Sequence, residues 1–253
     1  MGWVDKVMFT AARTTLGYGS MFAHAVTQRA LLRRPEVRAA LLRQIYFTGV
    51  QGLPMTALIS VLFGAIVVTK TLEYLGADNE LALQAVVWGG LRELGPLVTA
   101  LLIVVRSSVA IAAEVALMRL REGISDALWK DAVHEQEVVL PRVVGVAFAS
   151  MLLVAFFQFI GVTAALLAAA VTLGSTLKAE IEHFLGAAAW WQIPLSIGKS
   201  ALMGAGIGAI SCWHGLQVEH DVRDIRKAVV AAGVGSLGFV MVVDLLAALL
   251  LLA

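Results

Sequence analysis

The sequence predicts an all-α polytopic membrane protein, in which an N-terminal interfacial amphipathic helix precedes five transmembrane helices. Of its 253 residues, 60% are apolar and only 15% are charged, whereas about 25% of the residues of an ordinary soluble domain are charged. Five predominantly apolar stretches are also long enough to cross a bilayer, which takes ~20 helical residues. No stripe of Lys and Arg with interleaved aromatic residues indicates nucleic acid, so that class of partner is excluded.

Residues 1–46 are the first predicted segment, an amphipathic helix that lies in the inner headgroup layer. They combine apolar side chains with seven Lys and Arg residues, a composition typical of helices that bind anionic headgroups. The alternative is an ordinary solvated basic face on a packed helix. Because charged residues interrupt the first 30 positions, we expect no cleaved signal peptide there. The five-span domain is predicted at residues 47–253.

The first two spans are defined by their prolines. Residues 47–69 carry no formal charge and form the first span. Pro54, which follows two glycines, predicts a kink or break near the start of this span, because proline removes a helical hydrogen bond. The second span begins at Gly95 and Pro96, since proline suits the first turn of a helix, and it ends near residue 118.

Two charges lie inside the second span. Arg106 and Glu114 are eight residues apart, and therefore about 80° apart around a helix of 3.6 residues per turn. A direct pair between them is not expected. Both are predicted to be structural intramembrane charges, each bonded to another helix or to a second copy of the chain.

The last three spans are predicted at residues 143–173, 193–213 and 228–253. The third is longer than a straight crossing needs, so it tilts or projects beyond the bilayer. In the fourth, Gly204 and Gly208 form a face of small residues that lets another helix approach closely.

The distribution of positive charge predicts the orientation. Fourteen Lys and Arg residues lie in residues 1–46 and in the links 117–142 and 215–227, and three lie in the other two connections. The positive-inside rule therefore places the N-terminus and the two richer links in the cytoplasm, with the C-terminus outside.

Lys199 and Asp244 lie inside the fourth and fifth spans at matching depths. Lys199 follows Trp191, an aromatic residue suited to the headgroup level, by eight residues, which is about 12 Å along a helix. Asp244 lies nine residues before the end of the chain, about 13 Å from the same side. We expect these two side chains to make contact and to line a polar pocket in the outer half, since ionisable groups in a span face a partner or water. The alternative is that Lys199 snorkels to the outer headgroups and that Asp244 caps a frayed helix.

Arg92 and Glu93 stand just before the second span. A carboxylate at this place favours the positive end of a helix, so Glu93 is either a cap or a ligand contact. Adjacent side chains diverge by about 100° around a helix, so the two residues can serve different partners.

Enzyme chemistry finds little support in the sequence. Gly198-Lys199-Ser200 resembles the end of a phosphate-binding P-loop, but Ile193 occupies the position of the first glycine, and no strand precedes it. The chain therefore has no nucleotide site, and any ATP use belongs to a separate subunit. The histidines show no metal-ligand spacing, and no nucleophile has an adjacent base. A secondary transporter that couples protons through Lys199 and Asp244, or a membrane scaffold, stays open.

Together these residues resemble the MlaE/YrbE-type permeases, which are membrane subunits of ABC transporters that move phospholipid or related lipid with MCE-domain proteins. The resemblance covers about residues 45–250 and depends on the order and spacing of short motifs. These motifs are Arg92-Glu93-Leu94-Gly95-Pro96, Arg106 with Ala113-Glu114, Met118, Asp126-Ala127-Leu128, Leu140-Pro141-Arg142, Lys199-Ser200, Ser211-Cys212 with Gly215, and Asp244.

The resemblance implies a multi-pass permease of the bacterial inner (cytoplasmic) membrane with a periplasmic C-terminus. It implies a dimer with a second copy or a paralogue, two ABC ATPase subunits, an MCE-domain protein on the outer face and a phospholipid cargo. The chain itself needs no cofactor or metal, because ATP and Mg belong to the partner ATPase.

The resemblance also assigns roles to residues. A cytoplasmic coupling helix between the second and third spans maps to about 122–135, within a coupling segment at 119–140. The candidates for lipid binding are Arg92, Glu93, Lys199, Asp244 and Tyr74. The candidates for coupling to the ATPase are Glu122, Ile124, Asp126, Ala127 and Leu128.

Three departures from the family pattern are evident. Ser108 replaces the usual glycine two residues after Arg106. The usual Glu-Gln-Ile-Asp-Ala-Leu run is one residue longer at 122–128 and lacks the Asp-Pro that follows it, and the glycine-rich link between spans four and five has become the charged run 219–224. Because the last two change cytoplasmic contact surfaces, they predict a divergent branch or one half of a heterodimer.

Overall fold

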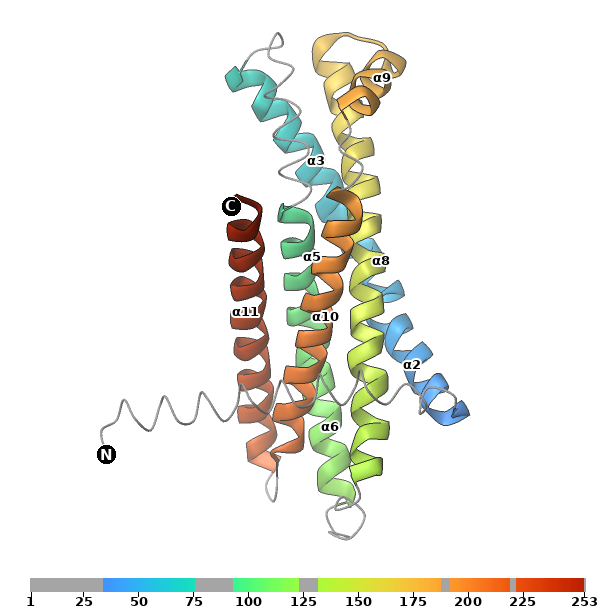
Figure 1. The fold of residues 1–253 in the computed structure, drawn as a ribbon, viewed down its shortest axis with the longest axis vertical. Helices are drawn as coiled ribbons and strands as arrows, with labels where there is room; N and C mark the ends of the chain where they lie inside the picture. The colour runs from blue at the N-terminus through green and yellow to red at the C-terminus, as the bar shows by residue number, and fades with distance from the viewer. Residues whose placement is uncertain (1–33, 76–92, 123–131, 188–191, 219–221, 253) are drawn as a thin grey trace, which may run out of the picture.

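The computed structural model describes residues 34–75, 93–122, 132–187, 192–218 and 222–252, which are almost entirely helical, with no strand among them. Five helical stretches of this described part are long and apolar enough to cross a membrane. Figure 1 shows an elongated bundle in which the first of these stretches runs obliquely to the others. The predicted all-α fold, with an N-terminal helix and five spans, is confirmed.

The chain enters the bundle through a broken helix. Gly49 ends its first part, with its N–H donating to the Ile45 carbonyl at 2.7 Å. The break predicted near Pro54 is confirmed, and it lies just ahead of the proline. The boundary between residues 46 and 47 stays a prediction. Residues 1–33 of the predicted interfacial segment lie outside the described part. The elements are α2 (Pro35–Thr48), the 3-10 turn η2 (Val50–Gly52) and α3 (Leu53–Leu75).

One face of α2 packs against the bundle. Val37 and Gln44 are buried, and a Cβ added at Gly145 would lie only 2.8 Å from the Gln44 Cγ. Arg38 and Arg43 are exposed on the other face. The described end of the predicted interfacial segment is therefore a packed helix with a basic outer side, which is compatible with both interpretations of its charges.

The second span starts where its proline predicts. It consists of α5 (Gly95–Ile103), a π-helical turn labelled η4 (Val104–Ser108) and α6 (Val109–Glu122). Gly95 and Pro96 are buried at its beginning. The π turn contains Arg106 and was not predicted from the sequence.

The third span differs from its predicted start. α8 (Ala132–Leu173) contains Pro141 in its interior, whereas the sequence predicted that the span begins after this proline. The residues before it, Val133 to Leu140, include strong helix formers and extend the same helix toward its N-terminal end. The 42 residues of α8 measure ~63 Å at ~1.5 Å per residue, so the prediction that this span exceeds a simple crossing is confirmed.

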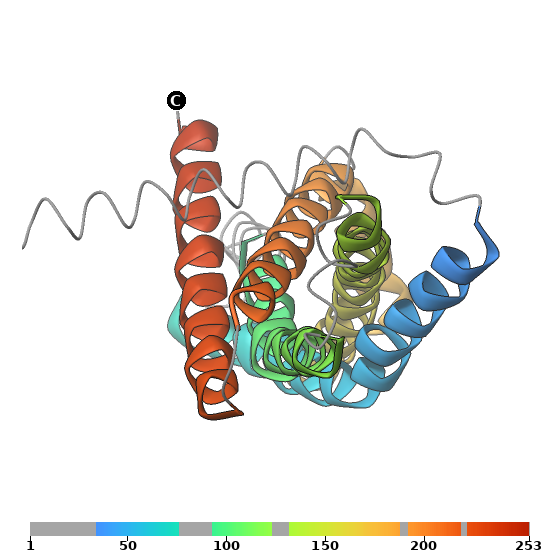
Figure 2. The same ribbon diagram turned by 90° about the horizontal axis from the view of Figure 1, so that it is seen from below.

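The remaining helices complete the bundle. α9 (Leu177–Ala187) lies in the predicted link between the third and fourth spans, and it follows a turn at Gly174 whose φ of 65° favours glycine. α10 (Gln192–Leu216) and α11 (Val222–Leu252) are the fourth and fifth spans. In Figure 1, α8 and α9 extend past the start of α10 and the end of α11, and in Figure 2, α11 lies along one side of the bundle.

The glycine face of α10 lets two other helices approach closely. A Cβ at Gly204 would lie 2.8 Å from the Val146 carbonyl oxygen of α8, and a Cβ at Gly208 would lie 2.9 Å from the Val143 Cα. A Cβ at Gly206 would collide with the ring of Phe239 of α11. The predicted close approach is confirmed, with α8 on one side of the helix and α11 on the other.

Buried hydroxyl groups join the same helices. Ser150 Oγ donates to the Ser200 carbonyl at 2.7 Å, and Ser200 Oγ donates back to the Ser150 carbonyl at 3.0 Å. Ser211 Oγ donates to Ser108 Oγ at 2.9 Å, and Ser108 Oγ lies 3.1 Å from Ser236 Oγ. These bonds connect α8 to α10, and the second span to α10 and α11. Such bonds stabilise helix association in an apolar medium that provides little hydrophobic driving force.

We expect Gly204→Ala to lower the free energy of unfolding by about 1–3 kcal/mol, because the added methyl group is too close to the α8 backbone. The measurement is thermal unfolding of the purified protein in detergent. Gly198→Ala is the matched control on the same helix, since a Cβ there meets nothing within 4 Å. A loss of equal size in both variants would contradict the close packing of α8 on α10.

Candidate functional site

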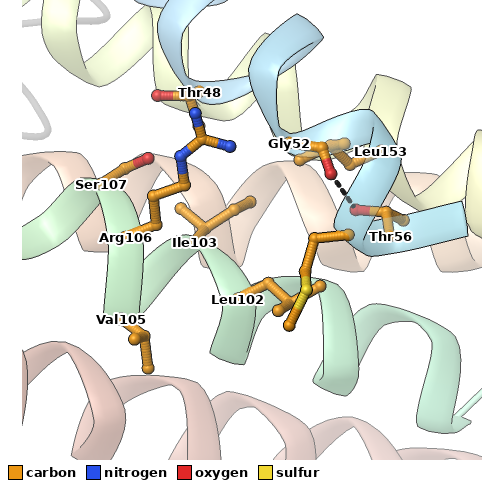
Figure 3. Close-up of a pocket in the computed structure, with 10 residues that line it drawn as sticks. Thr48, Gly52, Thr56, Leu102, Ile103, Val105, Arg106, Ser107 and Leu153 are labelled. Carbon is orange, nitrogen blue, oxygen red and sulfur yellow. Dashed lines mark hydrogen bonds between the residues drawn. The ribbon is translucent and has the colours of Figure 1, made fainter. Parts of the chain in front are cut away.

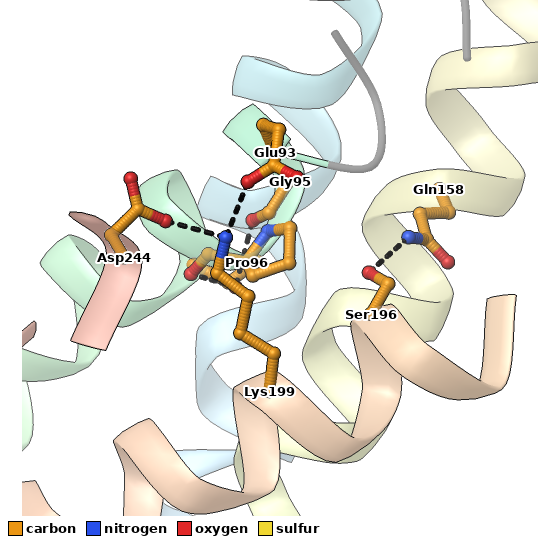
Figure 4. A network of polar contacts seen from close by, with 8 residues as sticks. Glu93, Gly95, Pro96, Gln158, Ser196, Lys199 and Asp244 are labelled. Carbon is orange, nitrogen blue, oxygen red and sulfur yellow. Dashed lines mark hydrogen bonds and ion pairs between the residues drawn. The ribbon is translucent and has the colours of Figure 1, made fainter. Parts of the chain in front are cut away.

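An ion cluster joins the start of the second span to α10 and α11 (Figure 4). Lys199 extends from α10, with its Nζ 2.6 Å from Glu93 Oε2 and 2.7 Å from Asp244 Oδ1. Glu93 lies two residues before Gly95, the first residue of α5, and Asp244 belongs to the last third of α11. One ammonium group therefore connects residues that are far apart in the sequence.

Burial makes this cluster energetically important. The Lys199 side chain is 8% exposed, while those of Glu93 and Asp244 are 32% and 23% exposed. A charged group removed from water is costly unless an opposite charge compensates it. The two carboxylates provide that compensation, and the three charges sum to −1 when all are ionised. The carboxylates are also the members of the cluster that remain accessible to a ligand.

The local backbone holds the cluster in place. Thr99 Oγ1 donates to the carbonyls of Gly95 and Pro96 at 2.9 and 3.0 Å, so the first turn of α5, next to Glu93, is fixed. On another side of α10, Gln158 Nε2 donates to Ser196 Oγ at 2.6 Å. Figure 4 shows this second contact about one helical turn from Lys199, on the side that faces α8.

The predicted contact between Lys199 and Asp244 is confirmed. The alternative, in which Lys199 snorkels to the headgroups and Asp244 caps a frayed end, is wrong because Lys199 is buried between two carboxylates. The sequence did not predict that Glu93 would be the second partner. The signal was present, since Glu93 and Lys199 both stand near the start of a span on the same predicted side.

The other candidates for lipid binding are less constrained by the structure. Tyr74 is 78% exposed near the end of α3, where the Lys70 ammonium lies 6.0 Å from its ring centroid. The structure does not bring Tyr74 into the ion cluster. Arg92 lies outside the described residues. Lipid binding by either residue stays a prediction.

The charges of the second span bond to other helices, as predicted. Glu114 Oε1 lies 3.2 Å from Arg142 Nη2 of α8, and Arg142 Nη1 donates to the Val138 carbonyl at 2.7 Å. Arg106 donates to the backbone and side chain of Gln51 in η2. Arg106 and Glu114 form no pair with each other.

The coupling residues are only partly described. Glu122 is the last residue of α6. Ile124, Asp126, Ala127 and Leu128 lie outside the described residues, and so does most of the proposed coupling helix. Within the part of the chain that the structure describes, no group of three or more His, Cys, Asp and Glu side chains is arranged to hold a metal ion.

Comparison with known proteins identifies similar sequences. The profile of the family described as Permease MlaE matches residues 41–250. A probable ABC transporter permease protein of Rickettsia conorii is 28% identical over 228 residues, which cover 88% of this chain and 86% of the relative. The intermembrane phospholipid transport system permease protein MlaE of Haemophilus influenzae is 33% identical over 119 residues, 45% of each chain. The chloroplastic protein trigalactosyldiacylglycerol 1 of Arabidopsis thaliana is 24% identical over 208 residues, 80% of this chain and 59% of the relative.

We expect Lys199→Met to destabilise the protein by about 1–3 kcal/mol, because Glu93 and Asp244 then lose their shared cation; their partial exposure keeps the loss below that of a fully buried pair. Combining it with Glu93→Gln and Asp244→Asn should restore most of the lost stability by removing the uncompensated charge. Thermal unfolding in detergent measures both variants. If the triple variant is no more stable than Lys199→Met, the ion pairs are not what holds these helices.

Proposed function

This chain belongs to the MlaE permease family, and from that membership we propose that it is the membrane subunit of an ABC transporter that moves phospholipid or a related lipid. The observation that carries the proposal is the ion cluster of Glu93, Lys199 and Asp244 inside a largely apolar helical bundle. A lipid needs an apolar surface for its acyl chains and a few charged groups for its headgroup. This chain has both in the same region.

Exposed apolar side chains near the cluster support a lipid ligand. α11 exposes large apolar side chains along the turns on either side of Asp244, which a soluble protein would bury. Such a surface suits acyl chains of bilayer lipid or of a bound lipid. These side chains are Leu237, Met241, Val242, Leu245, Leu246, Leu249 and Leu250.

The charges of the cluster suggest how a headgroup enters it. A headgroup phosphate would compete with the carboxylates for Lys199, and a headgroup amine would bind Glu93 or Asp244, the more exposed members. Either exchange loosens the connection between α5, α10 and α11. In this proposal the ion pairs hold the site closed, and the lipid replaces them.

We assign ATP hydrolysis and its Mg to a separate ATPase subunit that binds the coupling segment between α6 and α8. α6 continues through the π turn into α5, so a displacement at the coupling segment would reach Glu93 along one helical stretch. The Glu114–Arg142 pair fastens this stretch to α8. A rigid-body movement of these helices would then open or close the lipid site.

The remaining parts of the assembly follow from the family. We propose a dimer with a second copy or a paralogue, an MCE-domain protein on the outer face and a location in the bacterial inner membrane. The N-terminus would be cytoplasmic and the C-terminus periplasmic. The arrangement of the described helices supports this orientation, because the end of α6 and the starts of α8 and α11 lie at the same end of the bundle (Figure 1). These helix ends carry Arg119, Arg121, Arg142, Arg223, Arg226 and Lys227.

We expect Lys199→Ala to reduce crosslinking of a photoreactive phospholipid to α10 and α11 several-fold, because the headgroup loses its cation. The measurement uses the complete transporter in nanodiscs, with crosslinked peptides identified by mass spectrometry. Lys178→Ala, at a side chain that is 86% exposed on α9, is the control for general charge effects. Unchanged crosslinking in Lys199→Ala, with the assembly intact, would refute lipid binding at the cluster.

Charge reversal at Glu122 or Asp126 should weaken attachment of the ATPase and lower lipid-stimulated ATP hydrolysis, because both residues belong to the proposed coupling segment. Co-purification of the ATPase with each variant measures the attachment. Glu182→Lys, on α9 at the opposite end of the bundle, is the control. Full attachment and full ATPase activity in both variants would count against this coupling segment, whereas proton-driven flux without any ATPase would support a secondary transporter.

A further inference from the structure

Arg106 occupies an unusual place in the second span. It lies in the π turn Val104–Ser108, and single π turns within α-helices are frequent at functional sites. Its Nη2 donates to Gln51 Oε1 at 2.8 Å, and its Nη1 donates to the Gln51 carbonyl. The guanidinium also lies 5.5 Å from the ring centroid of Phe47. All these partners are electrically neutral.

The charge of Arg106 is therefore not compensated by the described protein. No carboxylate lies within ion-pair distance of Arg106 among the residues that the structure describes. Gln51 accepts from two of the five N–H donors that a guanidinium carries. A cation within a membrane span faces a partner or a wet cavity as a rule, so a ligand with negative charge would complete this site.

A pocket of about 230 Å³ lies beside the guanidinium (Figure 3). It is formed between the α2–α3 junction, the end of α5 with its π turn, and α8. The lining is apolar apart from Arg106 and three hydroxyl groups. Its apolar side includes Met55, Leu102, Ile103 and Leu153. Met55 is 53% exposed, so the pocket reaches the outer surface of the apolar helices.

A buried hydroxyl group marks the polar end of this pocket. Ser107 is 1% exposed, and its Oγ has no hydrogen-bond partner within the described protein. Leaving a buried hydroxyl without a partner costs about 1–3 kcal/mol. In Figure 3 this hydroxyl points toward the side where the Arg106 guanidinium lies. A ligand acceptor atom between the two would satisfy both.

We propose that this pocket binds the headgroup of an anionic lipid. One negatively charged oxygen pairs with Arg106 and accepts a hydrogen bond from Ser107, and the acyl portion passes along Leu102 and Met55 to the bilayer. The pocket volume is below the 300–1,000 Å³ of pockets that enclose whole drug-sized ligands, so it holds a headgroup and the start of a chain. Most of each acyl chain of the lipid remains outside the pocket.

This site is distinct from the ion cluster and goes beyond the proposed function. Arg106 lies thirteen residues after Glu93, which is about 20 Å along a helix. The two sites also differ in charge. The cluster has two carboxylates for one cation, whereas among the described residues that line the other pocket Arg106 alone is charged. Binding at Arg106 does not depend on whether the cluster takes part in transport.

The test uses the purified full-length chain in detergent with a phosphatidylglycerol that carries a photoreactive group in its acyl chain. We expect crosslinks at Met55 and Leu102 that unlabelled phosphatidylglycerol displaces at least about tenfold more effectively than phosphatidylcholine, and that inorganic phosphate does not displace. Arg106→Gln should abolish them. Ser107→Ala should weaken them several-fold without lowering stability, because it removes a hydroxyl that has no protein partner.

Two matched variants separate the possible outcomes. Arg226→Gln, at an exposed position of α11, should leave the crosslinks unchanged, and so should Lys199→Ala. Wild-type crosslinking in both Arg106→Gln and Ser107→Ala would overturn the proposal, and so would equal competition by phosphatidylcholine or by inorganic phosphate. Because loss of Lys199 also destabilises the protein, the Lys199→Ala variant is compared at a temperature where thermal unfolding shows it to be folded. Loss of the crosslinks in this folded variant would show that the two sites are one, which also contradicts the proposal.

Discussion

The structure depends on how a buried ammonium group is compensated inside an apolar bundle. Lys199 is almost fully removed from solvent, and a charge in that position persists only when opposite charge lies close to it. Glu93 and Asp244 provide that charge from two other helices. The arrangement of the beginnings of α5 and α10 and the end of α11 is consequently tied to one side chain, so any group that competes for Lys199 also acts on the helices.

The contacts of α10 with α8 and with the middle of α11 have the opposite character. Glycines on α10 allow backbones to approach until no methyl group fits, and serine hydroxyls bond across the same contacts. These interactions are short-ranged and neutral, so they form a rigid centre around α8 and α10. Charged residues lie at the edges of this centre, at Arg106 and in the ion cluster. A charged ligand bound there would change the electrostatic energy of the bundle most. This division of roles suits the proposed transporter, in which rigid helices would transmit movement from a separate ATPase to the ion cluster.

Much of this architecture could be predicted from the sequence, because it follows from the positions of prolines and from the depth of charged residues within the spans. The start of the second span at Gly95 follows from the position of Pro96, and the Lys199–Asp244 contact follows from equal depths in two spans. At Pro141 the same rule gave a wrong helix start, because α8 begins nine residues before this proline. The helix-forming residues before it and packing against neighbouring helices outweigh the lost hydrogen bond there.

The contacts that the sequence did not predict depend on how the helices rotate against each other, which one sequence does not specify. These are the ion pair between Glu93 and Lys199 and the Ser108–Ser211–Ser236 contacts. Ser108, noted only as a departure from the family pattern, proved to be the centre of a buried hydroxyl network.

The account is tested most directly by a cryo-EM map of the complete transporter in lipid nanodiscs, at a resolution that shows side chains. It predicts that Lys199 lies between Glu93 and Asp244 in the lipid-free state and that a lipid headgroup contacts at least one of these three residues in the loaded state. A map in which Lys199 points away from both carboxylates, with no lipid beside α5, α10 and α11 in any state, would contradict it.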